Sequence, residues 1–180
     1  RRLRRLGDDL SALSRAEEGR ERFLLADVDL DALAAGVVAR FQPQASDAGI
    51  DLRVAPGAGR ARADADRTVQ VLTNLIGNAL RATPPGGRVH VTGARTHAGA
   101  SIIVEDTGVG LAPEDFERVF ERFYRVGGRP ASDGSGIGLT IARSYMRAMG
   151  GTLNAASDGV GRGARFTAIF APTSANADQG

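Results

Sequence analysis

Two asparagines stand one helical turn apart on the narrow polar side of an otherwise apolar stretch. The polar stripe recurs at i, i+4, i+8 and i+11 and consists of Gln70, Asn74, Asn78 and Arg81. Residues at this spacing share one face of a helix, so the pattern predicts a helix from Asp66 to Ala82. Asn is a poor helix former, and solvent-facing positions more often carry Glu, Lys or Arg. The stripe is equally compatible with a solvent face and with amides placed for a ligand.

A carboxylate and two glycines follow a short apolar strand at Ile102–Val104. The run Asp106-Thr107-Gly108-Val109-Gly110 puts the carboxylate at the strand tip and the glycines just beyond it. Asp and Gly are also the favoured residues of ordinary turns. By itself, this run indicates a site no more strongly than it indicates a turn.

Three glycines on alternate positions, in the run DGSGIGLT from Asp133 to Thr140, precede a helix predicted over Ile137–Met149. Free backbone N–H groups at a helix N-terminus attract anions such as phosphate. A dinucleotide fingerprint does not fit, because Leu139 occupies the place of its third glycine. The chain contains no Lys, which excludes a Walker A loop and the eukaryotic protein-kinase site. Gly161-Arg162-Gly163 is interpreted as a hairpin turn rather than a site.

The remaining pattern predicts the elements that must position these residues. A helix capped by Asp29 runs from Leu30 to about Asp47, and a long polar segment from Leu111 to Asp133 indicates a functional lid with one short helix. Short strands are predicted near residues 23–28, 50–54, 61–63, 89–94, 101–105, 152–156 and 164–170. Helices with mainly hairpin-connected strands favour an α/β (α+β) two-layer sandwich, with a mixed sheet and about three helices, over a Rossmann sheet.

Composition bounds the function. The 180 residues suffice for one main domain, and the absence of Cys excludes disulfides and thiolate metal sites. A net charge of +2 with interspersed acidic residues and no Trp argues against nucleic-acid binding. The chain begins with Arg and an amphipathic helix is predicted over residues 1–19, so we expect a piece of a longer polypeptide.

Taken together and in order, four runs are far more specific than any one of them. NLIGNALRAT, DTGVG, FERVFERFYR and GSGIGLTIA resemble the N, G1, F and G2 boxes of the catalytic ATP-binding domain of bacterial sensor histidine kinases. That domain belongs to the ATPase superfamily shared with gyrase, Hsp-type chaperones and mismatch-repair proteins. The resemblance implies three parts: the end of a dimerisation helix at 1–21, the ATP-binding domain with a mobile lid at 22–172, and a flexible tail at 173–180.

The resemblance also implies roles for individual residues. Asn78 matches the Mg²⁺ ligand, Asp106 the acceptor for the adenine amino group, and Arg125 a mobile contact to the γ-phosphate, so Asn78 and Arg125 are the catalytic candidates. Arg81 matches a basic phosphate contact. The other candidate nucleotide contacts are Asn74, Ala82, Gly108, Gly110, Tyr124, Gly134, Ser135, Gly136, Ile137, Gly138 and Leu139. For Arg125, a plain surface charge is nearly as good an interpretation.

Two features depart from the pattern and bear on the reaction. Hydrolytic and serine-kinase members of the superfamily carry a general-base Glu where this chain has Asn74, which cannot take a proton. We therefore expect ATP to be held for transfer to an acceptor and hydrolysed poorly. Ala82 stands where many relatives have an aromatic over the adenine, and Ala164 replaces a usual Thr or Ser.

The implied function is transfer of the ATP γ-phosphate, with Mg²⁺, to a histidine on a dimerisation domain, for relay to a response regulator. Neither His90 nor His97 lies in an acceptor motif; they are interpreted as surface strand and loop residues, so the acceptor lies elsewhere. The full protein is expected to be a membrane-anchored homodimer with this part cytoplasmic and, when isolated, monomeric. Three alternatives stay open: an ATP-gated interaction module, the ATP-binding half of a split kinase, and an ATPase.

Overall fold

The computed structural model describes residues 22–96, 99–126 and 136–172, together with Gly7, Ser11 and Ser14, which are helical. Most of the helix predicted over residues 1–19 therefore lies outside the described residues. So do His97, Gly134, Ser135 and the tail from residue 173.

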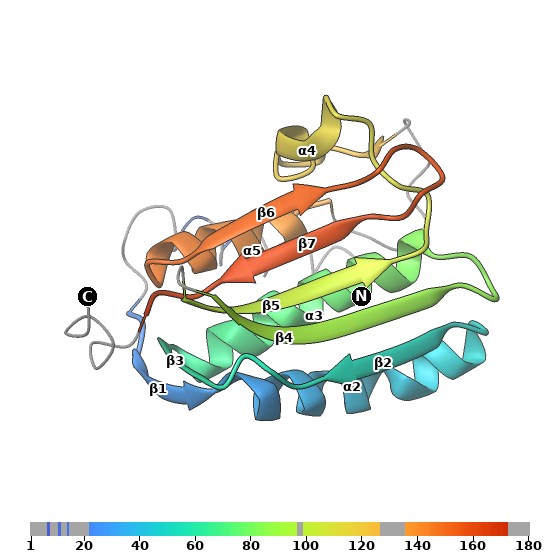
Figure 1. Cartoon of the computed structure of the whole chain (residues 1–180). Helices are drawn as coiled ribbons and strands as arrows, with labels where there is room; N and C mark the ends of the chain where they lie inside the picture. The colour runs from blue at the N-terminus through green and yellow to red at the C-terminus, as the bar shows by residue number, and fades with distance from the viewer. Residues whose placement is uncertain are drawn as a thin grey trace.

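A five-stranded mixed sheet forms one layer of the molecule (Figure 1). Its order is β2-β4-β5-β7-β6, with β2 parallel to β4 and every other pair antiparallel. The strands are β2 Asp51–Ala55, β4 Arg88–Thr96, β5 Gly99–Asp106, β6 Thr152–Ala156 and β7 Arg165–Ile169. The predicted β4–β5 and β6–β7 hairpins and the mixed sheet are confirmed.

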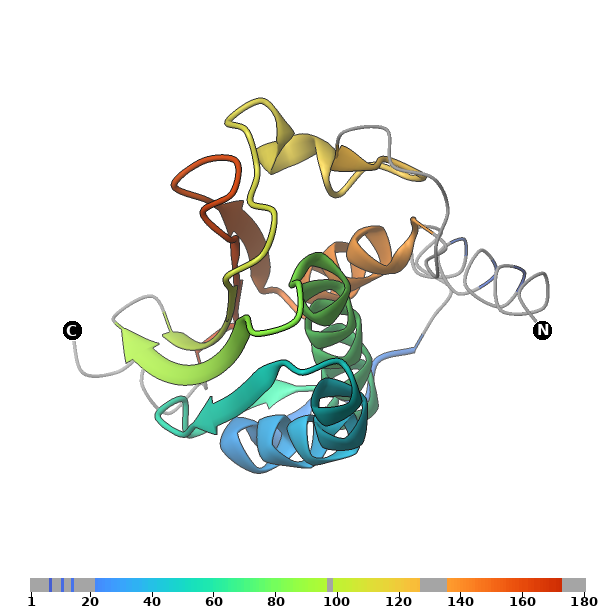
Figure 2. The same cartoon turned by 90° about the vertical axis from the view of Figure 1, so that its right-hand side faces the viewer.

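Helices α2 (Leu30–Asp47), α3 (Ala65–Ala82) and α5 (Gly138–Ala148) form the second layer, on one face of the sheet (Figure 2). Helix α3 packs against both α2 and α5 as well as against β4 and β5. Its apolar side is fully buried at Val71, Leu72, Leu75 and Ile76. Burial of such side chains is the main force that holds the two layers together. The predicted two-layer α/β sandwich is confirmed.

The start of α3 differs from the sequence-based prediction. The helix begins at Ala65 rather than Asp66, because the side chain of Asp64 is the cap and accepts from the backbone N–H of Arg67 at 3.0 Å. Asp66 lies in the first helical turn, where a negative charge also suits the helix dipole. Asp64 Oδ2 accepts a second backbone bond, from Leu24 N at 2.8 Å, which ties the N-terminal segment to α3.

A two-stranded sheet, β1 (Ala26–Asp29) with β3 (Arg60–Ala63), lies beside α2. The turn before β3 is held by one carboxylate in the first turn of α2. Asp31 Oδ1 accepts from the N–H groups of Gly57 and Ala58 at 3.0 and 3.1 Å, and Oδ2 accepts from Gly59 at 2.9 Å. Both oxygens of this carboxylate are therefore used within the fold.

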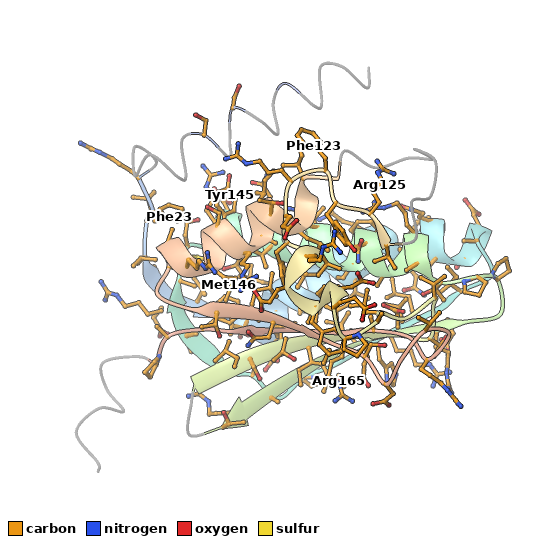
Figure 3. All side chains as sticks on the ribbon, turned by 90° about the horizontal axis from the view of Figure 1, so that it is seen from above. Phe23, Phe123, Arg125, Tyr145, Met146 and Arg165 are labelled. Carbon is orange, nitrogen blue, oxygen red and sulfur yellow. The ribbon has the colours of Figure 1, made fainter. Side chains whose placement is uncertain are left out.

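The other face of the sheet carries polar side chains that alternate with the buried ones. Cross-strand neighbours Arg53, His90, Glu105 and Arg165 form one exposed row. Figure 3 shows Arg165 on this face, opposite the helices. His90 is a surface strand residue, as expected. None of the helices in the described ranges is long and apolar enough to span a membrane.

Candidate functional site

Asp106, a residue that is only 6% exposed, ends β5. Its Oδ1 accepts from the backbone N–H of Gly108 at 2.8 Å and of Ala164 at 3.2 Å. Its Oδ2 is buried and has no hydrogen-bond partner within the described part of the chain. Leaving a buried acceptor unsatisfied costs about 1–3 kcal/mol, so such an atom marks a place where a ligand donor belongs.

The pKa of Asp106 agrees with a buried carboxylate that has too few hydrogen-bond donors among the described residues. Burial raises the pKa of this carboxyl above its ordinary value, and the nearby charge of Glu105 adds to the rise. The N–H groups of Gly108 and Ala164 lower it, but not enough to cancel the effect of burial. A donor brought to Oδ2 would favour the ionised form and offset this cost.

The loop after Asp106 is clamped between the end of α3 and the β6–β7 turn. Val109 N donates to Ala82 O at 3.2 Å, and Val109 O accepts from Gly161 N at 2.7 Å. Gly110 has a φ of +67°, and a Cβ there would overlap the carbonyl oxygen of Gly159. A side chain at Gly110 is thus excluded both by conformation and by space.

The Gly161–Gly163 pair does more than the predicted hairpin turn requires. It joins β6 to β7, as expected, but Gly163 N also donates to Gly108 O at 3.1 Å. The φ of Gly163 is +75°, and a Cβ would overlap the carbonyl oxygen of Asp106. The two glycines in the sequence indicated this close packing against the Asp106 loop. The hydrogen bond from Ala164 N to Asp106 could not be predicted from the residue type, because any residue except Pro supplies a backbone N–H.

The polar stripe of α3 faces a partly covered side of the helix. Gln70, Asn74 and Asn78 are half-buried, and Arg81 is exposed. Asn74 lies against the first residue of α5, with its Oδ1 3.3 Å from the position that a Cβ on Gly138 would take. Its Nδ2 is buried and has no hydrogen-bond partner among the described residues. At Asn74 the stripe is therefore not an open solvent face, and the ligand contact predicted for this residue stays a prediction.

The same helix joins the two ends of the site. Asn74 is beside the N-terminus of α5, Ala82 is beside the Asp106 loop, and Asn78 lies midway, about 6 Å along the axis from each. Ile137 and Leu139 pack with the core, and Ile137 is fully buried. The ligand contacts predicted for Ile137 and Leu139 stay predictions.

The first part of the predicted lid is fixed to the body of the domain. In helix α4 (Asp115–Arg118), Glu117 forms a 2.7 Å ion pair with Arg143 of α5. Phe120 packs edge-on against Phe166 of β7, with ring centroids 6.2 Å apart, and lies under the guanidinium of Arg143. The expected short helix is thus present and anchored.

The segment after α4 approaches the glycine loop. Phe123 has a strained φ of +62°, and its N–H donates to Gly136 O at 2.9 Å. Tyr124 donates its hydroxyl to Asp115, which raises the pKa of the phenol. Arg125 is half-buried on the helix side of the sheet (Figure 3). The nucleotide contacts predicted for Tyr124 and Arg125 stay predictions.

Among the described residues, an unsatisfied acceptor on Asp106 at one end, and the unsatisfied Nδ2 of Asn74 beside the N-terminus of α5 at the other, match a ligand with a donor-bearing ring and an anionic tail. Fold and site together define an α/β sandwich of the ATP-binding class.

Residues 63–174 match the family model described as histidine kinase-, DNA gyrase B- and HSP90-like ATPase. Sensor protein IrlS of Burkholderia pseudomallei is 36% identical over 159 residues, which cover 87% of this chain and 34% of that protein. Sensor-like histidine kinase SenX3 of Mycobacterium tuberculosis is 38% identical over 170 residues, covering 91% and 41%. The chain therefore spans about a third to two fifths of the length of these relatives.

A solved structure of full-length ShkA in complex with AMPPNP superposes with a TM-score of 0.82 at 31% identity, over 96% of this chain and 37% of that one. The catalytic domain of histidine kinase ThkA superposes with a TM-score of 0.73 at 25% identity, over 83% and 96%. The chain belongs to the histidine kinase-, DNA gyrase B- and HSP90-like ATPase family, as the sequence motifs implied.

Proposed function

We propose that the chain is the ATP-binding catalytic domain of a sensor histidine kinase, which transfers the γ-phosphate of ATP to a histidine on a dimerisation domain. The observation that carries the base specificity is the buried Oδ2 of Asp106, which has no hydrogen-bond partner among the residues that the structure describes. A carboxylate oxygen accepts the 6-amino group of adenine but repels the 6-carbonyl of guanine, so ATP is selected over GTP.

Asn78 is the residue we assign to Mg²⁺. The described residues contain no cluster of three or more acidic or histidine side chains that would hold a metal ion by themselves. A single neutral amide oxygen suits an ion that takes its other ligands from phosphate oxygens and water. When bound, Mg²⁺ would neutralise charge on the triphosphate.

Asn74 supports transfer rather than hydrolysis. Its Nδ2, which lacks a partner in the described part of the chain, is the proposed donor to a phosphate oxygen, whereas no lone pair on this amide is basic enough to activate water. In the proposed reaction the bond from the γ-phosphorus to the bridging oxygen breaks, a bond to an imidazole nitrogen forms, and ADP leaves. A neutral imidazole needs little activation as the nucleophile.

The N-terminal boundary of the domain is inferred at residue 22. Phe23 packs edge-on against the buried Tyr145 of α5, with ring centroids 5.8 Å apart. Both side chains are labelled in Figure 3. Residues 22–172 thus form the proposed ATP-binding domain, with residues 1–21 as the end of the dimerisation helix and 173–180 as a tail. A response regulator is the proposed final acceptor.

Phosphotransfer tests the proposal directly. The chain is mixed with γ-labelled ATP, Mg²⁺ and a separately prepared dimerisation domain of a related sensor kinase. We expect acid-labile, alkali-stable phosphohistidine on that domain and little free phosphate without it. ATP binding by calorimetry without any transfer would instead favour an ATP-gated interaction module, and rapid release of phosphate by the chain alone would favour an ATPase.

Asn78→Ala should reduce this transfer about 1,000-fold, because loss of the metal contact costs several kcal/mol of transition-state stabilisation. Asn154→Ala is the matched control, since Asn154 is an exposed residue of β6. Equal rates in the two variants would refute the metal role of Asn78.

A further inference from the structure

The hydroxyl of Ser157, just after β6, joins three segments of the chain. Its Oγ accepts from the backbone N–H of Leu111 and of Gly159, each at 3.1 Å. It lies 2.6 Å from the carbonyl oxygen of Gly163 and 3.0 Å from that of Gly159. A hydroxyl has two lone pairs and one proton, so the two N–H groups fill the lone pairs and the proton goes to the nearer carbonyl, Gly163.

The Gly163 carbonyl belongs to the same peptide unit as the N–H of Ala164. That N–H donates to Asp106 Oδ1 at 3.2 Å. Because a peptide unit is planar, the directions of its C=O and N–H are set together. One rigid unit therefore has Ser157 at one end and the base-recognition carboxylate at the other.

The neighbouring peptide units are held by other bonds. Gly163 N donates to Gly108 O at 3.1 Å, and Ala164 O accepts from Asp106 N at 2.9 Å. These bonds do not fix the tilt of the unit between them, and Gly163, at φ +75°, has the conformational freedom to let it tilt. Ser157 supplies the restraint on the side away from Asp106.

We propose that Ser157 is a positioning residue for recognition of the purine 6-amino group. By orienting the Gly163–Ala164 peptide it holds one of the two N–H donors to Asp106 Oδ1, the other being Gly108 N at 2.8 Å, and both together keep Oδ2 turned toward the base. The inference rests on the proposed role of Asp106 as the adenine acceptor. Ser157 itself does not touch the nucleotide and acts through one peptide unit and one carboxylate.

The test compares ATP with purine riboside triphosphate, which has the same triphosphate but no 6-amino group. Calorimetry on the full chain gives the ratio of the two dissociation constants. For Ser157→Ala we expect ATP affinity to fall about tenfold and that of the analogue to change by less than about twofold, because only the amino contact depends on the aim of Oδ2. Ser157→Thr keeps the hydroxyl and should keep the ratio.

Ser101→Ala is the matched control, because Ser101 is buried and its hydroxyl donates to the carbonyl of Ala94 at 3.2 Å in the β4–β5 hairpin. It should leave both affinities unchanged. Ser157→Cys, which keeps the size of the side chain but donates weakly, gives an intermediate ratio and serves if Ser157→Ala does not fold.

In Ser157→Ala, a ratio of the two dissociation constants equal to that of the unmodified chain would overturn the proposal. If both affinities fell equally, the substitution would have caused a general defect of the turn. Asp106→Asn distinguishes failure of the proposed adenine contact from failure of the positioning role of Ser157. If it leaves the ratio intact, Asp106 does not read the amino group and the proposed site fails. If it abolishes the ratio and Ser157→Ala does not reduce it, only the role of Ser157 fails. In the double variant, Ser157→Ala should cause no further change in the ratio.

Discussion

Two carboxylates, Asp31 and Asp106, each accept hydrogen bonds from backbone N–H groups of a glycine-containing turn, yet their environments have opposite consequences. Asp31 uses both oxygens on the Gly57–Gly59 turn. Partial burial works to raise its pKa, but the three N–H donors outweigh burial and hold the pKa below the ordinary value. Asp106 uses one oxygen, and burial raises its pKa.

The difference separates a structural carboxylate from a binding one. Where the fold satisfies every oxygen, the charge stabilises the fold and nothing is left for a ligand. Where one oxygen is buried and unsatisfied, the fold bears a cost that a ligand donor removes. The same distinction applies to Asn74, whose Nδ2 is the unsatisfied donor at the other end of the site.

Among the changes that distinguish these two carboxylates, the largest expected effect is on ATP binding by Asp106→Asn. With the amide oxygen placed to accept from Gly108 and Ala164, the NH₂ group faces the adenine amino group; flipped, the NH₂ group faces two N–H donors. Either orientation sets donor against donor, so we expect ATP affinity to fall about 100-fold by calorimetry, with the free energy of unfolding changed by no more than about 1 kcal/mol.

The control for that substitution is the adjacent carboxylate. Glu105→Gln removes a charge that is exposed on the opposite face and paired with Arg165 at 2.7 Å. An equal loss of ATP affinity in this variant would show that net charge, and not the unsatisfied oxygen, governs binding.

Asp31→Asn should have the reverse effect. The amide offers one acceptor oxygen where the turn needs two, so at least one backbone donor loses its partner. We expect the free energy of unfolding in urea to fall by about 2 kcal/mol, which is about 30-fold in the folding equilibrium, without a change in ATP affinity. Unchanged stability would contradict the assignment of Asp31 as a structural carboxylate. Asp47→Asn, at the exposed end of α2, is the matched control.

The contrast between these residues also explains what could be predicted from sequence. The layers, the mixed sheet and the Asn74 and Asn78 stripe follow from local periodicity and turn residues, which each segment carries by itself. The apolar run Ile102–Val104 placed Asp106 correctly at a strand tip. Local signals suffice where the information lies within one element.

Ser157 and Asp31 could not be found in this way. The Oγ of Ser157 bonds to Leu111, 46 positions away, and Asp31 bonds to Gly57, 26 positions away. No spacing rule relates such partners, because the distances are set by how the elements pack. The second cap oxygen of Asp64, which reaches back 40 positions to Leu24, was missed for the same reason.

Acid should separate the two carboxylates. The raised pKa of Asp106 means that it takes up a proton at a higher pH than an ordinary Asp, and the proton goes to the unoccupied Oδ2. A protonated Oδ2 faces the adenine amino group as a donor, so ATP affinity should fall about tenfold per pH unit below that pKa. Purine riboside triphosphate, whose phosphates titrate alike, should not share this loss.

The pKa of Asp31 is shifted in the opposite direction, below its ordinary value. Its folded-state pKa is below its unfolded-state value, so its contribution to stability is complete above the unfolded-state pKa of about 3.9 and is lost as the pH falls through the lower folded-state pKa. Urea unfolding at a series of pH values should therefore show this contribution intact where the ATP-specific loss of affinity is already measurable. Parallel losses would remove the distinction.

The smallest expected effect concerns base stacking at residue 82, an interaction in which Asp106 has no part. Ala82 is half-buried at the end of α3, and its carbonyl oxygen binds Val109 N beside the Asp106 loop. Ala82→Tyr should add a stacking surface for the base worth about 1 kcal/mol and tighten binding about fivefold. Because stacking does not detect the 6-amino group, ATP and purine riboside triphosphate should gain equally, whereas Ala39→Tyr, on the exposed side of α2, should change neither. A gain confined to ATP would mean that residue 82 acts by re-aiming the Asp106 loop, and selectivity would then no longer belong to the unsatisfied oxygen alone.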